Sequence, residues 1–328
     1  MTDFEKIDRV HLCHGPTAIE AMPRLSETLG CNLFVKRDDC TGLAGGGNKT
    51  RKLEYLLADA NAKGADTLIT IGGIQSNHAR QTAAAAAKFG FACHLVLEDV
   101  AGTPNKDYYH NGNILLDQLC GANIHQLADD EDSTVFAEQL TSQLISEGKK
   151  PYLIPVGGSN EVGSLGYIRC AKEIVAQLKA QDLSFDHIVL ATGSAGTQAG
   201  LLAGLITENI DIPVLGICVS RETQAQKIIV QELLEKTLSR INLPSSLAKN
   251  RVFTDGSYYG EGYGITTKAT IDAVKQCAQL EGLLLDPVYT GKGMAGLIDL
   301  AKQKKLGENI LFLHTGGSQG LFAYSDMF

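Results

Sequence analysis

In the stretch GGGNKTRKLEY, residues 45–55, three glycines stand directly before an asparagine, a lysine and a run of apolar residues at helical spacing. This spacing predicts a helix over 49–62 that Asn48 caps, with Lys49 in its first turn. A cation at a helix N-terminus is unfavourable by roughly 0.3–1 kcal/mol. The helix alone therefore does not explain why a lysine stands there.

Two interpretations of Lys49 follow from the residues around it. It is either a solvated surface lysine with its stem along the helix, or a lysine whose charge is removed in an imine with an aldehyde cofactor. The three glycines leave backbone room beside it for such a bond. The nearby cations Lys52 and Arg51 would then be free to meet a phosphate.

The composition is that of an ordinary globular chain and excludes several function classes. With 328 residues, 44% hydrophobic and 20% charged, we expect two domains or one large α/β unit. The net charge of −8 and the lack of a basic stripe argue against a nucleic-acid partner. No signal peptide and no membrane-length apolar run is present, so no membrane is expected. The eight cysteines form no CxxC pair, and HLCH at 11–14 lacks zinc-site spacing. We therefore expect no metal site, and reduced thiols in the cytoplasm.

Strand-like apolar runs alternate with helical patterns along most of the chain. The runs are short and rich in Val, Ile and Leu, as in buried parallel strands. This alternation predicts an open, doubly wound parallel α/β sheet. The expected strands are 67–71, 93–97, 123–127, 152–156, 188–191, 214–219 and 310–313, and the expected helices are 49–62, 83–87, 135–145, 166–178, 197–207, 225–238 and 267–280. Residues 1–48 show few helical repeats, and the polar segment 101–113 is expected to be a loop over a cleft.

Ligands of open α/β sheets bind beyond the carboxyl ends of the strands. The segments 72–80, 192–200 and 314–320 each follow an expected strand, and with 45–49 they are rich in glycine and in hydroxyl or amide side chains. Such loops expose backbone N–H groups at a helix start and so favour an anion. The best phosphate cradle is formed by Gly193, Ser194, Ala195, Gly196 and Thr197. It is neither a P-loop nor a dinucleotide fingerprint, and glycines there would equally allow close helix–sheet packing.

Five motifs together carry a resemblance to a known family. GGGNKTRKLEY (45–55), GGIQSNHAR (72–80), GSAGTQAG (193–200), EGLLLDPVYTGKGMAGL (281–297) and HTGG (314–317) resemble the pyridoxal-phosphate enzymes of the tryptophan-synthase-β fold type, fold type II. Within that type they are similar to the D-cysteine desulfhydrase and 1-aminocyclopropane-1-carboxylate (ACC) deaminase family. The similarity extends from about Gly15 to Tyr324.

The resemblance implies two doubly wound open sheets and a homodimer. A large cofactor-binding domain would comprise residues 1–48 plus 162–328, and a small domain residues 49–161, with the cofactor between them.

The resemblance also implies how the cofactor is held. Lys49 would carry pyridoxal 5'-phosphate as an imine. Lys52 and the loop 193–197 would hold its phosphate. Asn77 would donate a hydrogen bond to the 3′-oxygen of the pyridine ring.

On the substrate side, the resemblance implies that Ser76 binds the substrate carboxylate, together with backbone N–H groups of the 75–78 loop, and assists proton transfer. His78, Tyr263 and Tyr289 would line the substrate pocket. Without the resemblance, ordinary core packing would be the preferred explanation of both tyrosines.

Two positions distinguish the members of this family. ACC deaminases carry Glu after the tyrosine of DPVY and Leu in the motif HLGG, whereas Thr290 and Thr315 stand here. A carboxylate beside the pyridine nitrogen keeps that nitrogen protonated and makes the ring a strong electron sink. A threonine leaves the pyridine nitrogen largely neutral. The weaker electron sink that results is sufficient when the leaving group carries the negative charge away. The two threonines therefore favour β-elimination of a thiolate over opening of a cyclopropane.

The activity expected from the resemblance is β-elimination of D-cysteine to pyruvate, hydrogen sulfide and ammonia. Lys49 or Ser76 would take the Cα proton, and Tyr289 would give a proton to the leaving thiolate. The alternatives are an L-cysteate sulfo-lyase, for which Arg221 and His78 are the available cations, and an ACC deaminase. From other classes, a nicotinamide-dependent oxidoreductase is disfavoured by the missing GxGxxG, and a non-catalytic binding protein by the lack of an export signal. The sequence leaves the substrate's stereochemistry open.

Overall fold

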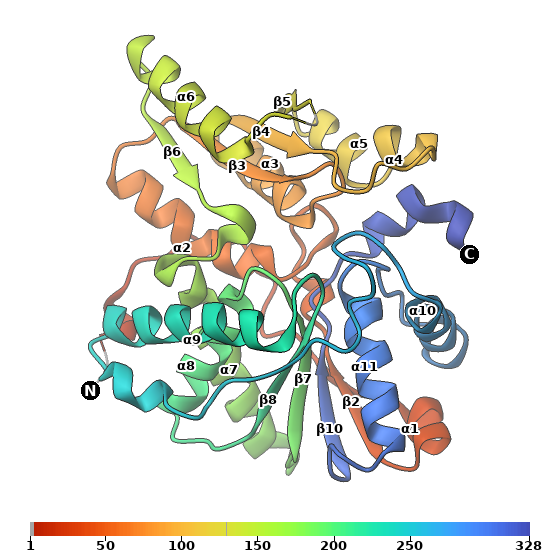
Figure 1. Cartoon of the computed structure of the whole chain (residues 1–328). Coiled ribbons are helices and arrows are strands. Elements are labelled where there is room, and N and C mark those ends of the chain that lie inside the picture. The colour runs from red at the N-terminus through yellow and green to blue at the C-terminus, as the bar shows by residue number, and fades with distance from the viewer. Residues whose placement is uncertain (1–2, 129) are drawn as a thin grey trace.

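The computed structural model describes residues 3–128 and 130–328 and folds them around two separate β-sheets (Figure 1). The larger sheet has the order β1-β2-β10-β7-β8-β9, and the smaller has the order β5-β4-β3-β6. All neighbouring strands run parallel except β1 and β2. The strands are β1 Ile19–Ala21, β2 Asn32–Lys36, β3 Thr67–Gly73, β4 Ala92–Glu98, β5 Asn123–Gln126, β6 Pro151–Ile154, β7 His187–Thr192, β8 Val214–Cys218, β9 Phe253–Asp255 and β10 Asn309–Leu313.

Helices cover both faces of each sheet, as a doubly wound fold requires (Figure 1). Their bounds are α1 Pro23–Leu29, α2 Lys49–Ala62, α3 Asn77–Phe89, α4 Lys106–His110, α5 Asn113–Leu119, α6 Ser133–Ser146, α7 Glu161–Gln181, α8 Gly196–Thr207, α9 Thr223–Arg240, α10 Lys268–Glu281 and α11 Thr290–Lys302. Each strand and helix expected from the sequence is present, most of them with ends shifted by a few residues. The expected α/β class with two parallel-rich sheets is confirmed.

Several elements were not expected from the sequence. The N-terminal 48 residues hold β1, β2 and α1, and the segment 101–113, expected to be a loop, contains α4. Helix α11 was also missed, because Gly291, Gly293 and Gly296 lower its helix propensity. These glycines lie against neighbouring elements; a Cβ at Gly296 would stand 2.8 Å from the Ile217 side chain.

The central strands of the larger sheet are buried on both faces. On β7, Ile188 and Leu190 belong to the core cluster shared with α7 and α8, whereas Val189 between them belongs to the cluster with α10 and α11. Strand β10 alternates in the same way. Two buried faces explain why both strands are continuous apolar runs in the sequence.

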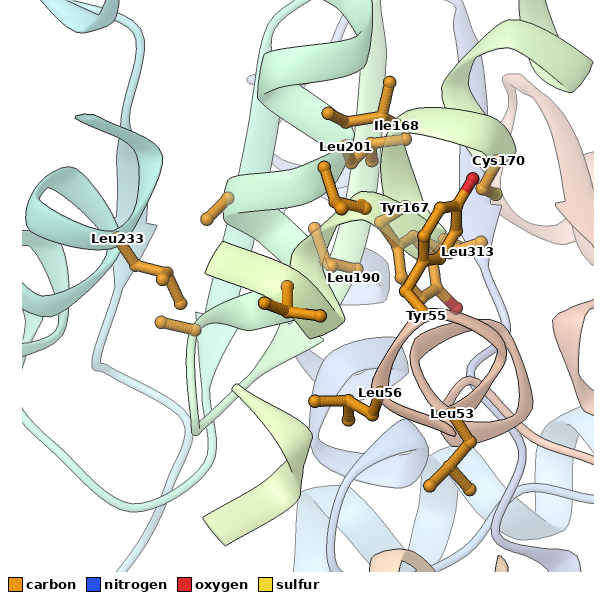
Figure 2. Close-up of a cluster of buried hydrophobic side chains, with 14 of the residues drawn as sticks. Leu53, Tyr55, Leu56, Tyr167, Ile168, Cys170, Leu190, Leu201, Leu233 and Leu313 are labelled. Atoms are coloured by element: carbon orange, nitrogen blue, oxygen red, sulfur yellow. The ribbon is translucent and has the colours of Figure 1, made fainter. Parts of the chain in front are cut away.

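Helix α2 packs against α7 and carries the residues of the opening stretch into the core. Figure 2 shows Leu53 and Leu56 of α2 and Tyr167 of α7 as members of one buried cluster. The helices approach so closely that a Cβ at Gly166 would stand 2.2 Å from the carbonyl oxygen of Arg51. Full burial of a leucine contributes roughly 1.5–3 kcal/mol, so α2 is firmly anchored.

The carboxyl ends of β3, β7 and β10 all point toward the region where the two sheets meet (Figure 1). The loops that follow these strands are the three glycine-rich segments singled out in the sequence. The start of α2 reaches the same region. In the described residues, no helix is long and apolar enough to cross a membrane.

Candidate active site

Lys49 is the first residue of α2 and is buried. Its Nζ donates a hydrogen bond to Asn48 Oδ1 at 2.9 Å. Burial, and then the nearby Arg80 cation, lower the pKa of Lys49 to about 8. The solvated-surface interpretation is therefore wrong. Asn48 occupies the N-cap position, but its side chain does not cap the helix; it donates to Thr197 Oγ1 at 2.9 Å.

Lys52 lies one turn after Lys49 on the same side of α2 and is also buried. Its Nζ donates to the carbonyl oxygen of Gly157 at 3.0 Å and to Ser159 Oγ at 2.9 Å. Burial, and secondly the charge of Lys49, hold the pKa of Lys52 well below its usual value. Two of its three N–H donors are used, so the third remains for a ligand.

Arg51 does not take part in this group. Its guanidinium is buried on the opposite side of α2, where it donates to Asp38 at 2.8 and 2.9 Å and to Glu173 at 2.8 and 2.9 Å. The expectation that Arg51 would be free to meet a phosphate is therefore wrong. Successive helical residues are rotated by about 100°, which turns Arg51 away from the face that Lys49 and Lys52 share.

The loop 193–197 forms a tight turn next to Lys52. The Gly196 N–H donates to the carbonyl oxygen of Ser194 at 3.0 Å, which closes a γ-turn around Ala195 with φ 72° and ψ −32°. A Cβ at Gly196 would stand 2.7 Å from Ser159 Oγ and 2.9 Å from Lys52 Nζ. Glycine thus leaves open the space in front of the ammonium group. Several donors converge here: the Lys52 ammonium group, the hydroxyls of Ser159 and Ser194, and the N-terminus of α8. Together they form a donor set that fits a phosphate.

Asn77, the first residue of α3, is oriented by two donors. Its Oδ1 accepts from Asn113 Nδ2 at 2.9 Å and from Arg80 Nη1 at 3.4 Å. Asn113 cannot turn over, because its own Oδ1 accepts from Arg80 at 2.9 Å and a guanidinium only donates. In the described part of the chain Asn77 Nδ2 donates to no protein acceptor, and Asn77 lines the cleft. Its amide N–H groups are therefore available to a ring oxygen.

Ser76 and His78 stand at the start of α3. Ser76 caps the helix, since its Oγ accepts from the Ala79 N–H at 3.1 Å. Its hydroxyl hydrogen stays available to a substrate.

The His78 ring is held by Thr70. The Thr70 hydroxyl donates to the carbonyl oxygen of Ile154 at 3.0 Å, so it accepts from His78 Nε2 at 2.8 Å. His78 Nδ1 is buried without a hydrogen-bond partner in the described structure. Burial, then Lys49 and Lys52, hold the pKa of His78 well below its usual value, so the ring is neutral.

Tyr263 and Tyr289 come from separate elements and share a hydrogen bond of 2.8 Å between their hydroxyls. Lys49 Nζ lies 5.9 Å from the centre of the Tyr289 ring. Burial raises the pKa of Tyr263 to about 12 and raises the pKa of Tyr289 well above its usual value. Both phenols therefore stay protonated and can donate hydrogen bonds.

Most of the expected site residues line one cleft. A cavity of about 340 Å³ is bordered by Lys49, Ser76, Asn77, His78, Tyr263 and Tyr289. A narrower extension continues past Lys49 to Gly193, Ser194, Ala195, Thr197 and Thr315. Lys52 and Gly196 lie just behind this lining, in contact through Ser159.

Thr290 is placed differently from Thr315. Thr315 borders the narrow extension, whereas Thr290 does not. The Thr290 hydroxyl donates to Asp286 Oδ1 at 2.7 Å and accepts from the Asp286 N–H at 2.8 Å. Both of these bonds join it to Asp286, in the segment just before α11. The proposed contact of both threonines with a pyridine nitrogen stays a prediction.

The sequence reasoning overlooked four contributors to this site. Ser159, Asn48, Arg80 and Asn113 were not expected to take part in it. Ser159 could have been found, because the segment 157–160, Gly-Gly-Ser-Asn, follows a strand and has the same composition as the loops that were chosen. Asn113 is distant in sequence from the residue it orients, and no local pattern marks it.

Comparisons with known proteins agree with this geometry. The family model described as "Pyridoxal-phosphate dependent enzyme" matches residues 10–316. The chain belongs to the pyridoxal-phosphate-dependent enzyme family. Its cofactor is pyridoxal 5'-phosphate. The residues present fit this group: the Lys49 amine fits its aldehyde, Lys52 with the loop 193–197 fits its phosphate, and the oriented Asn77 amide fits its ring oxygen.

Individual relatives are similar over nearly the whole chain. The D-cysteine desulfhydrases of Salmonella choleraesuis (strain SC-B67) and Salmonella typhi are each 46% identical over 321 residues, covering 97% of both chains. A crystal structure described as an ACC deaminase homologue superposes with a TM-score of 0.91 at 41% identity, covering 98% of this chain and 96% of that one. A fungal L-serine ammonia-lyase from Rhizomucor miehei, with a TM-score of 0.66 at 17% identity, covers 94% of this chain and 95% of its own and shares the fold. The resemblance to fold type II pyridoxal-phosphate enzymes is confirmed.

Proposed function

We propose that the protein is a lyase that eliminates the β-substituent of D-cysteine, giving pyruvate, hydrogen sulfide and ammonia with the uptake of one water. The observation that carries the proposal is the 46% identity to D-cysteine desulfhydrases over 97% of the chain. The cleft supports it with a buried amine, a hydroxyl beside it and a pair of protonated phenols.

Bound pyridoxal phosphate supplies a sink for the electron pair left at Cα. We propose that Lys49 takes the Cα proton, with Ser76 as the competing base. The pKa of about 8 that burial gives Lys49 leaves a useful fraction of neutral amine near neutrality, whereas an ordinary lysine has almost none. Ser76 directs its hydroxyl hydrogen to the substrate carboxylate.

The leaving sulfur departs with the electron pair of the Cβ–S bond, and we propose that Tyr289 stabilises it. A free thiol has a pKa near 8.5, and the raised pKa of Tyr289 makes full proton transfer to the thiolate unfavourable. The three-carbon enamine that is released hydrolyses in water to pyruvate and ammonia.

A sulfonate leaving group is less well supported. A sulfonate needs a cation nearby, and His78 is neutral. The exposed Arg221 lies at the rim of the cavity, with its Nη1 bound to the carbonyl oxygen of Gly193 at 3.2 Å. ACC deaminases carry a glutamate and a leucine where this chain has Thr290 and Thr315, so the carboxylate beside the pyridine nitrogen is replaced by Thr290.

The decisive experiment measures the α-keto acid formed from D-cysteine, L-cysteine, L-cysteate and ACC. We expect pyruvate and sulfide from D-cysteine. Lys49→Ala should remove both turnover and the visible absorbance of the bound cofactor, and Lys63→Ala, an exposed lysine next to the end of α2, is the control. Full activity of Lys49→Ala, or turnover of L-cysteate alone, would contradict the proposal.

We also propose that the chain works as a homodimer in the cytoplasm. All eight cysteines are free, which suits a reducing compartment. The proposed division into residues 1–48 plus 162–328 and residues 49–161 assigns one sheet to each domain. Light scattering of the purified protein tests the dimer, and hydrogen exchange of the two sheets with and without cofactor tests the division.

A further inference from the structure

Lys292 is a buried lysine that the chemistry above does not use. It lies in the first turn of α11 and is fully buried. Its Nζ donates to three backbone carbonyl oxygens, those of Val219 at 3.1 Å, Tyr259 at 2.7 Å and Gly262 at 2.7 Å. An ammonium group has three donors, so this cage uses all of them.

Packing alone does not explain a lysine at this position. Burial of an ammonium is costly, and a cation in the first turn of a helix is unfavourable. In the described part of the chain no carboxylate forms an ion pair with Lys292, and burial lowers its pKa to about 8. An apolar side chain would avoid these costs but would remove the donor shared by one buried and two partly buried carbonyls.

The three carbonyls belong to separate parts of the cleft wall. Val219 directly follows β8 and borders the cavity together with Arg221. Tyr259 and Gly262 lie in the irregular segment 256–264, which carries Tyr263 into the cavity. Lys292 itself is one turn after Tyr289 on α11 and does not border the cavity.

We propose that Lys292 is a positioning residue, an internal cation that fastens the segment 256–264 to β8 and α11 and so keeps Tyr263 in hydrogen-bond contact with Tyr289. The geometry favours such a fastening, which acts beside the hydrogen bond of 2.7 Å from the Tyr258 hydroxyl to Asp299 of α11. The segment 256–264 has no regular secondary structure, yet Gly262 is next to a tyrosine whose hydroxyl must meet Tyr289 at 2.8 Å. This inference rests on the proposed place of the two tyrosines in the substrate pocket.

The test begins with the holoenzyme of Lys292→Ala. Backbone amides of 256–264 should exchange hydrogen faster, and the KM for D-cysteine should rise by about tenfold, the effect of losing roughly one hydrogen bond, with a smaller change in kcat. Lys302→Ala, an exposed lysine at the other end of α11, is the matched control and should behave like the unaltered protein.

Chemical rescue distinguishes a specific role of the Lys292 cation from a general increase in the flexibility of the cleft wall. Added n-propylammonium replaces the atoms removed from Lys292 and should restore KM and exchange, whereas tetramethylammonium, which has charge but no N–H donor, should not. Restoration by both ions equally, or by neither, would overturn the proposal. If the alanine variant does not fold, Lys292→Met, which keeps the volume, is measured by exchange in its place, and unchanged exchange at 256–264 overturns the proposal.

A double substitution tests whether the effect passes through Tyr263. In a Tyr263→Phe background, Lys292→Ala should raise KM by far less than it does alone; an equal rise would contradict the positioning role. A Tyr263→Phe variant with unchanged KM would refute the pocket assignment, and absence of D-cysteine turnover in the unaltered protein would refute the proposed reaction. The exchange measurement stays informative in both cases, because it needs no substrate.

Discussion

Replacing Lys52 with glutamine should weaken cofactor binding without harming the cofactor-free chain. In the holoenzyme the free donor of Lys52 would meet the phosphate, and a hydrogen bond to a charged group contributes roughly 1.5–3 kcal/mol. Its loss corresponds to an affinity about 10- to 150-fold lower. Glutamine keeps an N–H donor that can still reach Gly157 or Ser159, so the change isolates the charge.

The cofactor-free chain should respond in the opposite direction. Burial and the neighbouring Lys49 hold the pKa of Lys52 well below its usual 10.5. The folded state therefore binds this proton less tightly than the unfolded state, and stability is lost as the pH falls from 10.5 through the folded pKa. Glutamine removes this loss, so at pH 7 the Lys52→Gln chain without cofactor should melt at the same temperature as the unaltered chain, or higher.

The assay has two parts. Cofactor is removed, and pyridoxal phosphate is titrated back while the visible absorbance is followed; melting temperatures are then measured with and without cofactor. Lys63→Gln is the control, because Lys63 is exposed and its ammonium group pairs with Asp59 on the surface of α2, away from the cleft. The reasoning is refuted if Lys52→Gln binds the cofactor within twofold of the unaltered protein, or if it lowers both melting temperatures equally.

Three further outcomes are expected. Because the pKa of Lys49 is about 8 in the fold and ordinarily 10.5, Lys49 should contribute about 3 kcal/mol to the rise in stability of the cofactor-free protein between pH 8 and 10.5. In urea unfolding, Lys49→Ala should lack this contribution. Thr290→Glu combined with Thr315→Leu should weaken thiol elimination and introduce ring opening of ACC, measured as sulfide and 2-oxobutanoate; no change in either would refute the role of the threonines. Asn113→Asp, which cannot donate to Asn77, should weaken cofactor binding by about three- to tenfold, and this loss should vanish in an Asn77→Ala background.

The sequence predicted the architecture well where burial leaves a strong pattern. Strands buried on both faces, such as β7 and β10, appear as uninterrupted apolar runs, and long helices have clear periodicity. The two edge strands of the larger sheet were missed for a physical reason. β1 and β9 are three residues long, and the glycines that let α11 approach the sheet remove the helix signal.

The sequence predicted which loops border the cavity but not how the side chains on them are oriented. The rule that ligands bind beyond parallel strands selected segments that border one cavity, and Lys49, Ser76 and Asn77 lie together there. Which face of α2 a cation occupies depends on what packs behind the helix, so Arg51 was misjudged. The direction of the Asn77 amide is set by Asn113, far away in sequence.

Helix α2 has a consequence for how this chain can change in length. In its first turn, the rotation from residue to residue places Lys49 and Lys52 on the side of the cleft and turns Arg51 to the opposite side of the helix. A single inserted or deleted residue between positions 49 and 52 would rotate one ammonium by about 100° relative to the other. This short segment therefore tolerates substitutions far better than indels, and designed variants should confine length changes to exposed turns such as the one after α6.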